Sequence, residues 1–236
     1  MKKLKNWDNK TWLSSNKYIF SLNTFLKNNI KLKKNYKILD IGCGRAYIID
    51  HLYKKYKFNQ KPFGIDIIKH RDISKKIRFK KIDAIKFLSQ TNETFDLIFV
   101  KQTIHFFTKK NLKKLVKLMK LRLKNNGRIV IMSLDTKSNE IPCFSSMKIA
   151  LEKSLEKDKY ILKFLKKNLG EFIEKKFVFK VILKRNDYIR MLKNRYISCM
   201  LKMSAEQIKN GVNEILRDYG KKIVFKDKLI CLIYKN

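Results

Sequence analysis

The sequence predicts a doubly wound α/β fold around a parallel β-sheet. Short apolar segments typical of strands alternate with segments of helical periodicity through the first 135 residues. A glycine-containing turn joins the first of these strands to the helix that follows it. The run Phe95–Val100 is nearly continuously apolar, as expected of a central strand covered by helices on both faces.

The N-terminal elements follow in order along the chain. Residues 7–28 carry aromatic and aliphatic side chains with near-helical spacing, which predicts one or two amphipathic helices. A strand over 37–41 runs straight into Gly42, and apolar residues at helical spacing follow it. Two further short strands are expected at 63–67 and 77–82, the first containing and the second preceding an aspartate.

The central elements continue this alternation. One apolar face over 112–123 predicts a lysine-rich helix, and Asn125-Asn126-Gly127 is expected to close it as a left-handed cap. Residues 128–134 predict the fifth strand. The C-terminal part predicts helices over 147–174 and 187–203, a strand over 177–183, a helix from a capping box at Ser204 to Tyr219, and strand segments at 222–225 and 229–234.

Composition favours one soluble domain. The chain has 236 residues and is 44% hydrophobic, yet no apolar run reaches the roughly 18 to 20 residues of a membrane span. Polar residues interrupt the basic N-terminus where a signal peptide would be apolar. Four widely spaced cysteines show no metal-binding spacing, so we expect free thiols, no metal site and a cytoplasmic location; they are Cys43, Cys143, Cys199 and Cys231.

The formal net charge of +37 permits two interpretations. It is typical of proteins that bind nucleic acid or anionic membranes. However, nine of the 57 basic residues are Arg and 48 are Lys, spread over nearly every segment. Arg is the residue that grips phosphate and guanine with two hydrogen bonds, so we favour compositional drift of an AT-rich genome.

The glycine turn is the first candidate binding site. Gly42 and Gly44 let a ligand approach the backbone where the next helix presents free N–H groups. Asp66 lies 22 residues after Gly44, where a carboxylate can accept both ribose hydroxyls, and Asp83 ends the third strand. A dinucleotide fingerprint would require a third glycine at position 47, which is Tyr47.

These segments together resemble the class I S-adenosylmethionine-dependent methyltransferases. Ile38-Leu39-Asp40-Ile41-Gly42-Cys43-Gly44 is similar to the first motif of that family, and the resemblance continues in order through 64–67, 83–84, 95–98 and 123–128. It implies a Rossmann-like, seven-stranded sheet with one antiparallel strand, in a single domain over 1–236. Within it, 1–35 would form an N-terminal helical cap, 36–135 the cofactor-binding core, and 136–236 the substrate-side helices and final strands.

The resemblance also implies the positions that bind S-adenosylmethionine. The methionine moiety would contact Asp40, Gly42, Cys43, Gly44 and the backbone of Lys101; the ribose would contact Asp66; and the adenine would contact Ile67, Asp83 and Ala84. The family often has a third glycine where this chain has Ala46. Alanine should fit there if its φ is negative.

The acceptor side is less distinct. Methyl transfer is an in-line displacement that depends chiefly on positioning, and His105 is the best-placed general base, with helix packing as the alternative. Trp12 and Tyr18 form either a lid or part of the core. After the fourth strand, the chain lacks the Pro-containing motifs of the exocyclic-amine and 5-methylcytosine nucleic-acid methyltransferases and has Lys101-Gln102-Thr103 instead.

The C-terminal pattern resembles small-molecule methyltransferases of the type 11 and trans-aconitate methyltransferase branch. That resemblance implies Arg195 and Tyr196 near the acceptor, with Arg195 pairing a carboxylate or lying on the surface. We therefore expect methyl transfer to O, N or S of a small molecule, with Gln102 among the substrate-binding residues. The alternatives are an RNA methyltransferase and a non-catalytic nucleotide- or RNA-binding module; oligomeric state is not predicted.

Overall fold

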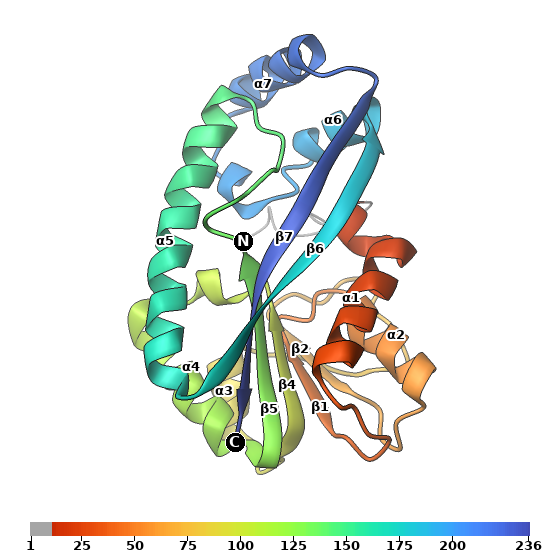
Figure 1. Ribbon diagram of the computed structural model, residues 1–236, viewed down its shortest axis with the longest axis vertical. Coiled ribbons are helices and arrows are strands. Elements are labelled where there is room, and N and C mark those ends of the chain that lie inside the picture. The colour runs from red at the N-terminus through yellow and green to blue at the C-terminus, as the bar shows by residue number, and fades with distance from the viewer. Residues whose placement is uncertain (1–10) are drawn as a thin grey trace.

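A computed structural model describes residues 11–236 as a seven-stranded sheet covered by helices (Figure 1). The strand order is β3-β2-β1-β4-β5-β7-β6, and β7 runs antiparallel to both of its neighbours. This arrangement confirms the predicted fold class. Residues 1–10, including the start of the predicted 7–28 segment, lie outside the described residues.

The first five strands form the parallel part of the sheet. Their bounds are β1 Ile38–Ile41, β2 Phe63–Asp66, β3 Arg78–Lys81, β4 Phe95–Lys101 and β5 Leu123–Leu134. β1 is central, pairs with β2 and β4, and is buried at all four positions. A strand buried on both faces cannot alternate apolar and polar residues, which explains the continuous apolar runs of the sequence.

Helices bury the two faces of the sheet separately. The helices α1 (Asn16–Asn29) and α2 (Tyr47–Tyr56) share a hydrophobic core with Ile38, while α3 (Ala84–Gln90), α4 (Lys109–Leu121) and α5 (Ser145–Leu169) share another with Leu39. The alternation of neighbouring strand residues between the two cores is the period-2 geometry of a β-strand. Figure 1 shows α1 and α2 beside β1 and β2, with α5 running along the opposite side.

The predicted cap at Gly127 is wrong. Helix α4 ends at Leu121, and residues 123–134 already belong to β5. Asn126, not Gly127, has a left-handed φ of 62°, and the pairing register between β4 and β5 shifts between Phe95 and Leu97. The Asn-Asn-Gly signal therefore accompanies an irregularity in a strand, which uses the same backbone freedom as a helix cap.

The C-terminal strands are longer than predicted. β6 (Phe172–Lys184) and β7 (Lys222–Lys235) pair continuously, so 222–225 and 229–234 belong to one strand instead of two. β5 pairs with β7 only as far as Leu229, and beyond that point β6 and β7 continue as a two-stranded ribbon. In Figure 1 this ribbon extends past the sheet toward α6 (Arg185–Lys193) and α7 (Ala205–Asp218).

The predicted helix over 187–203 is interrupted. Helix α6 ends at Lys193, and Arg195 has a left-handed φ of 51° before the short 3-10 helix η4 (Ser198–Met200). Two further 3-10 helices, η2 (Trp12–Ser14) and η3 (Ile104–Phe106), follow the N-terminal segment and β4. The predicted capping box is confirmed, because Ser204 and Gln207 exchange both side-chain to backbone hydrogen bonds at the start of α7.

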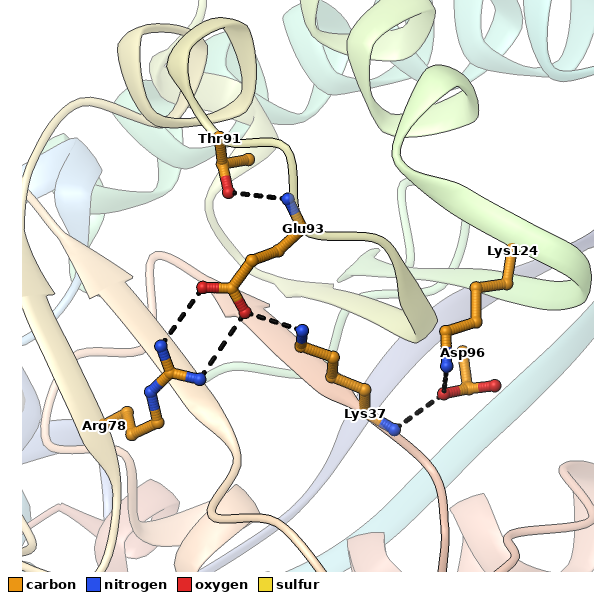
Figure 2. A network of polar contacts seen from close by, with 6 residues as sticks. All are labelled: Lys37, Arg78, Thr91, Glu93, Asp96 and Lys124. Atoms are coloured by element: carbon orange, nitrogen blue, oxygen red, sulfur yellow. Dashed lines mark hydrogen bonds and ion pairs between the residues drawn. The ribbon is translucent and has the colours of Figure 1, made fainter.

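Polar contacts join the strands at the edge of the sheet where β1, β3 and β4 begin (Figure 2). Glu93 accepts from Lys37 Nζ at 2.8 Å and from Arg78 at 3.1 Å. Asp96 accepts from the Lys37 backbone N–H and from Lys124 Nζ, both at 2.8 Å. These contacts connect strands at the edge opposite to the glycine turn. None of the helices within residues 11–236 has the length and apolar character needed to cross a membrane.

Candidate active site

A cavity of about 470 Å³ opens at the carboxyl ends of β1, β2 and β4. This is the edge at which parallel α/β sheets bind ligands. All nine predicted cofactor residues line it: Asp40, Gly42, Cys43, Gly44, Asp66, Ile67, Asp83, Ala84 and Lys101. Segments between residues 40 and 101 thus meet around one space, because consecutive parallel strands all end at the same edge.

The glycine turn brings backbone against the cavity. Gly42 and Gly44 have φ values of 72° and 55°, which side chains rarely adopt. The N–H groups of Gly42 and Cys43 both donate to the carbonyl of Ile65, at 2.8 and 3.1 Å, so the turn is attached to β2. The backbone therefore approaches any bound ligand from a fixed position.

The backbone conformation of Ala46 differs from the expected one. It lies immediately before α2 with φ 60° and ψ 19°, so the condition of a negative φ is not met. The left-handed conformation explains why a glycine suits this place, since it carries a cost of roughly 1 kcal/mol for residues with a Cβ. Ala46 is only 1% exposed, and burial of its methyl group offsets part of that cost.

Two aspartates at strand ends are held by backbone N–H groups. Asp66 Oδ2 accepts from the Gly44 N–H and Oδ1 from the Ile68 N–H, both at 2.9 Å. These bonds fix the carboxylate at the cavity and leave each oxygen with a further lone pair. Asp83 caps α3 by accepting from the N–H groups of Ile85 and Lys86.

Asp40 is a buried carboxyl group that lines the cavity. It is 3% exposed within β1, and burial together with the charge of Asp66 raises its pKa to about 8, although nearby Lys101 opposes the shift. Burial also raises the pKa of the neighbouring Cys43 thiol. A cation in the cavity would favour the ionised form of Asp40.

A second, smaller cavity of about 40 Å³ adjoins the first. Leu13 and Gln102 line both cavities and form their common wall. Trp12, His105 and Tyr196 also line the second one, with the rings of Trp12 and Tyr196 in an edge-to-face contact at 5.1 Å. Four of the residues predicted on the acceptor side, including Gln102, therefore meet here.

Tyr18 and Arg195 lie elsewhere. Neither lines the first or the second cavity. Tyr18 is fully buried and packs edge to face against Phe177 and Phe179 of β6, so it belongs to the core and does not form a lid. The Arg195 guanidinium donates to the Met203 carbonyl at 3.1 Å, which ties the loop after α6 to the start of α7.

His105 follows β4 in η3 and lines the second cavity. Burial, and to a lesser degree the charge of Lys157, lowers its pKa to about 4. The imidazole is therefore neutral near pH 7. Among residues 11–236, the buried Nε2 atom has no hydrogen-bond partner, so it is available to a ligand.

Comparison with protein families matches residues 32–176 to the methyltransferase domain. The chain belongs to this family. The match confirms the resemblance to class I S-adenosylmethionine-dependent methyltransferases. It spans strands β1 to β5, the glycine turn and most of the cavity lining. The search of curated proteins found no significant match.

Solved structures share the fold of this methyltransferase. The plantazolicin methyltransferase BpumL in complex with SAH is 19% identical, with a TM-score of 0.54, and the match covers 100% of this chain and 89% of that one. A SAM-dependent methyltransferase from Archaeoglobus fulgidus is 20% identical, with a TM-score of 0.50 and coverages of 92% and 94%. A putative methyltransferase from Bacillus halodurans is 16% identical, with a TM-score of 0.55 and coverages of 90% and 97%.

Some residues that line the cavity of the methyltransferase were not predicted from the sequence. Arg45 is 3% exposed, and its Nε donates to both carboxylate oxygens of Asp72, at 2.9 and 2.8 Å. Tyr47 Oη donates to the same carboxylate at 2.9 Å. His70, which is buried, also lines the cavity. Only the position of Arg45 directly after Gly44 signalled a role, because Asp72 and His70 lie in a loop without a motif.

Proposed function

We propose that this methyltransferase transfers the methyl group of S-adenosylmethionine to a small-molecule acceptor. The observation that carries the proposal is the junction of two cavities at Leu13 and Gln102, one lined by all the predicted donor-binding residues and the other by predicted acceptor-binding residues. A transfer reaction requires two sites that meet at the reacting atoms.

The residues of the larger cavity fit the methyl donor. Asp66 has a fixed carboxylate with free lone pairs for ribose hydroxyls, and Ile67, 45% exposed, offers an apolar surface for the adenine. At Gly42 a side chain would collide with Thr103, so the turn presents bare backbone to the cavity. Asp40 supplies negative charge near a positively charged sulfonium. The complex of BpumL with SAH, the demethylated donor, supports the same use of this fold.

The chemistry needs little from the protein beyond placement. When bound, the donor supplies a methyl group on a positively charged sulfur. Leu13 and Gln102 would hold the acceptor atom in line with that group, and the apolar lining would exclude water. Neutral His105 would accept a proton if the acceptor keeps one until it reacts.

The second cavity favours a small acceptor group over RNA. Its volume is about 40 Å³, and Asp158 and Asp227 are among its lining residues. Carboxylates repel a ligand that brings phosphates close. The plantazolicin complexes show that this fold also serves a natural-product acceptor, in that protein.

Two measurements test the proposal. Calorimetry should detect binding of S-adenosylmethionine, and labelled donor should transfer its methyl group to a metabolite pool in preference to RNA. No heat of binding at high protein concentration would contradict every enzymatic interpretation. Label incorporated into RNA, with binding that weakens steeply as salt rises, would instead identify an RNA methyltransferase.

A further inference from the structure

The second cavity contains buried acidic groups with unused hydrogen-bonding capacity. Asp158 of α5 and Asp227 of β7 line it and are 4% and 1% exposed. Within residues 11–236, Oδ1 of each has no hydrogen-bond partner, and neither does Nε2 of His105. Three residues that line a space of about 40 Å³ thus each carry a buried polar atom without a hydrogen-bond partner. Two of these atoms are carboxylate oxygens, and the third, Nε2 of His105, is an acceptor when the imidazole proton is on Nδ1.

Such groups are costly unless a ligand pairs with them. A buried acceptor atom left without a partner destabilises the fold, and a charged one does so more strongly. Burial raises the pKa of Asp158 to about 6, even though Lys157 acts in the opposite direction. Burial also raises the pKa of Asp227, although Lys101, the Trp12 indole and the neighbouring Tyr18 hydroxyl act to lower it. A positively charged donor placed in the cavity would relieve both carboxylates.

We propose that the methyl acceptor is an amine whose nitrogen enters the second cavity, where Asp158, Asp227 and His105 receive its N–H groups. This inference rests on the proposed function. A primary ammonium carries three donors and no acceptor, which matches the three unpartnered acceptor atoms. A hydroxyl offers one donor, and a carboxylate or phosphate offers none and is repelled.

The walls of the cavity suit the same ligand. Trp12 and Tyr196 provide aromatic surface, to which cations are attracted. The Trp12 indole N–H donates to Asp227 Oδ2 at 3.2 Å, so it orients the carboxylate while Oδ1 remains available. The Lys157 ammonium does not occupy the cavity as a substitute partner, because it donates to the backbone carbonyl of His105 at 2.9 Å.

An ammonium must lose one proton before its nitrogen can accept a methyl group. With the imidazole proton on Nδ1, Nε2 of His105 relays one proton from the ammonium toward solvent and leaves a neutral amine with a lone pair. The nitrogen then forms a bond to the methyl carbon, and the electron pair of the broken S–C bond stays on sulfur. The product nitrogen carries the positive charge that sulfur loses, and the relayed proton is released to solvent.

The test compares three probes of equal chain length: propylamine, propan-1-ol and propionate. Each is incubated with labelled S-adenosylmethionine and the full chain, and the labelled product is quantified. We expect the amine to be methylated at least tenfold faster than either of the others. Faster or equal methylation of the alcohol or the acid, or no methylation of the amine by protein that binds the donor, overturns the inference.

Matched variants separate a role in the cavity from a general charge effect. Asp158→Asn keeps the side-chain shape and should lower the rate with propylamine at least tenfold without changing the affinity for S-adenosylmethionine. Glu156→Gln removes the same charge from an exposed position of α5, where the side chain is 64% exposed, and should leave the rate unchanged.

Asp227→Asn provides a second test if Asp158→Asn folds poorly. Equal rates in all variants overturn the inference, whereas loss of donor binding in the unmodified protein contradicts the proposed function instead.

Discussion

Thr103 occupies the space that a side chain at Gly42 would need. A Cβ built on Gly42 lies 2.8 Å from Cβ of Thr103, closer than real Cβ atoms approach. The two residues belong to the loops after β1 and β4, whose paired strands bring them together. The glycine is thus required by its neighbour as well as by its φ of 72°.

Gly42→Ala should therefore damage the donor cavity. We expect a fall in thermal stability of several degrees and at least a tenfold loss of affinity for S-adenosylmethionine, because the turn must move away from Thr103. Gly220→Ala is the matched control, since its added Cβ meets no atom within 4 Å. Equal effects of the two substitutions, measured by thermal unfolding and calorimetry, would show that the contact with Thr103 is unimportant.

Asp66→Ala should weaken binding of S-adenosylmethionine by at least about tenfold, which corresponds to the 1.4 kcal/mol typical of a lost charge-assisted hydrogen bond. The substitution also leaves the N–H groups of Gly44 and Ile68 without their acceptor. Calorimetry on variant protein shown to be folded by circular dichroism measures the effect. An unchanged affinity would show that Asp66 does not bind the ribose.

Asp40 should make donor binding depend on pH. Its pKa is raised to about 8 in the free protein, so much of it is protonated at neutral pH. A sulfonium favours the carboxylate, and affinity for S-adenosylmethionine relative to its neutral demethylated product should rise with pH and level off above about 8. Below that value the change is at most tenfold per pH unit. In Asp40→Asn the ratio should be flat; a parallel slope in both proteins would assign the titration to another group.

The ionised Asp158 carboxylate should lower the free energy of unfolding when no methyl acceptor is bound. Its folded pKa of about 6 exceeds the ordinary value of 3.8, so protonation favours the fold and stability is lost as pH rises between these values. Asp158→Asn removes this cost, which is of the order of 3 kcal/mol at pH 8. Thermal unfolding should show a more stable variant at pH 8 and a smaller difference at pH 5. A variant less stable at pH 8 would indicate that the carboxylate has a partner.

His105→Asn should lower the methyl-transfer rate by about 100-fold without altering donor affinity. This factor is at the lower end of what the loss of a general base usually costs. Because the pKa of His105 is about 4, its titration should produce no inflection in the rate near pH 6.5. Rate profiles between pH 5.5 and 8 check this. An unchanged methyl-transfer rate in the variant would show that His105 is not a general base and serves only in packing.

The lining of the larger cavity was largely predictable from local sequence. An apolar strand followed by glycines, and an acid at the end of the next strand, are features of a few consecutive residues. The parallel sheet then brings these strand ends to one edge whatever the rest of the chain does. For this reason every predicted cofactor residue lines the larger cavity, although Ala46 shows that backbone conformation was not readable from residue type.

The C-terminal half was less predictable because its strands and loops depend on distant partners. The sequence predicts two strand segments separated by 226–228, yet pairing with β6 makes them one continuous strand. Tyr18 and Arg195 are residue types that often bind ligands. In the fold, however, Tyr18 is buried against β6, and the Arg195 guanidinium donates to the Met203 carbonyl.

The fold class and the aspartates and glycines at the carboxyl edge of the sheet follow from short-range patterns, so the amino-acid sequence alone was enough to predict them. The lining of the second cavity, in contrast, depends on how the whole chain packs. The second cavity joins residues from η2, η3, α5 and β7, among them Trp12, His105, Asp158 and Asp227. Whether a side chain is buried, paired or available depends on contacts between segments far apart in the chain, and no local pattern records those contacts.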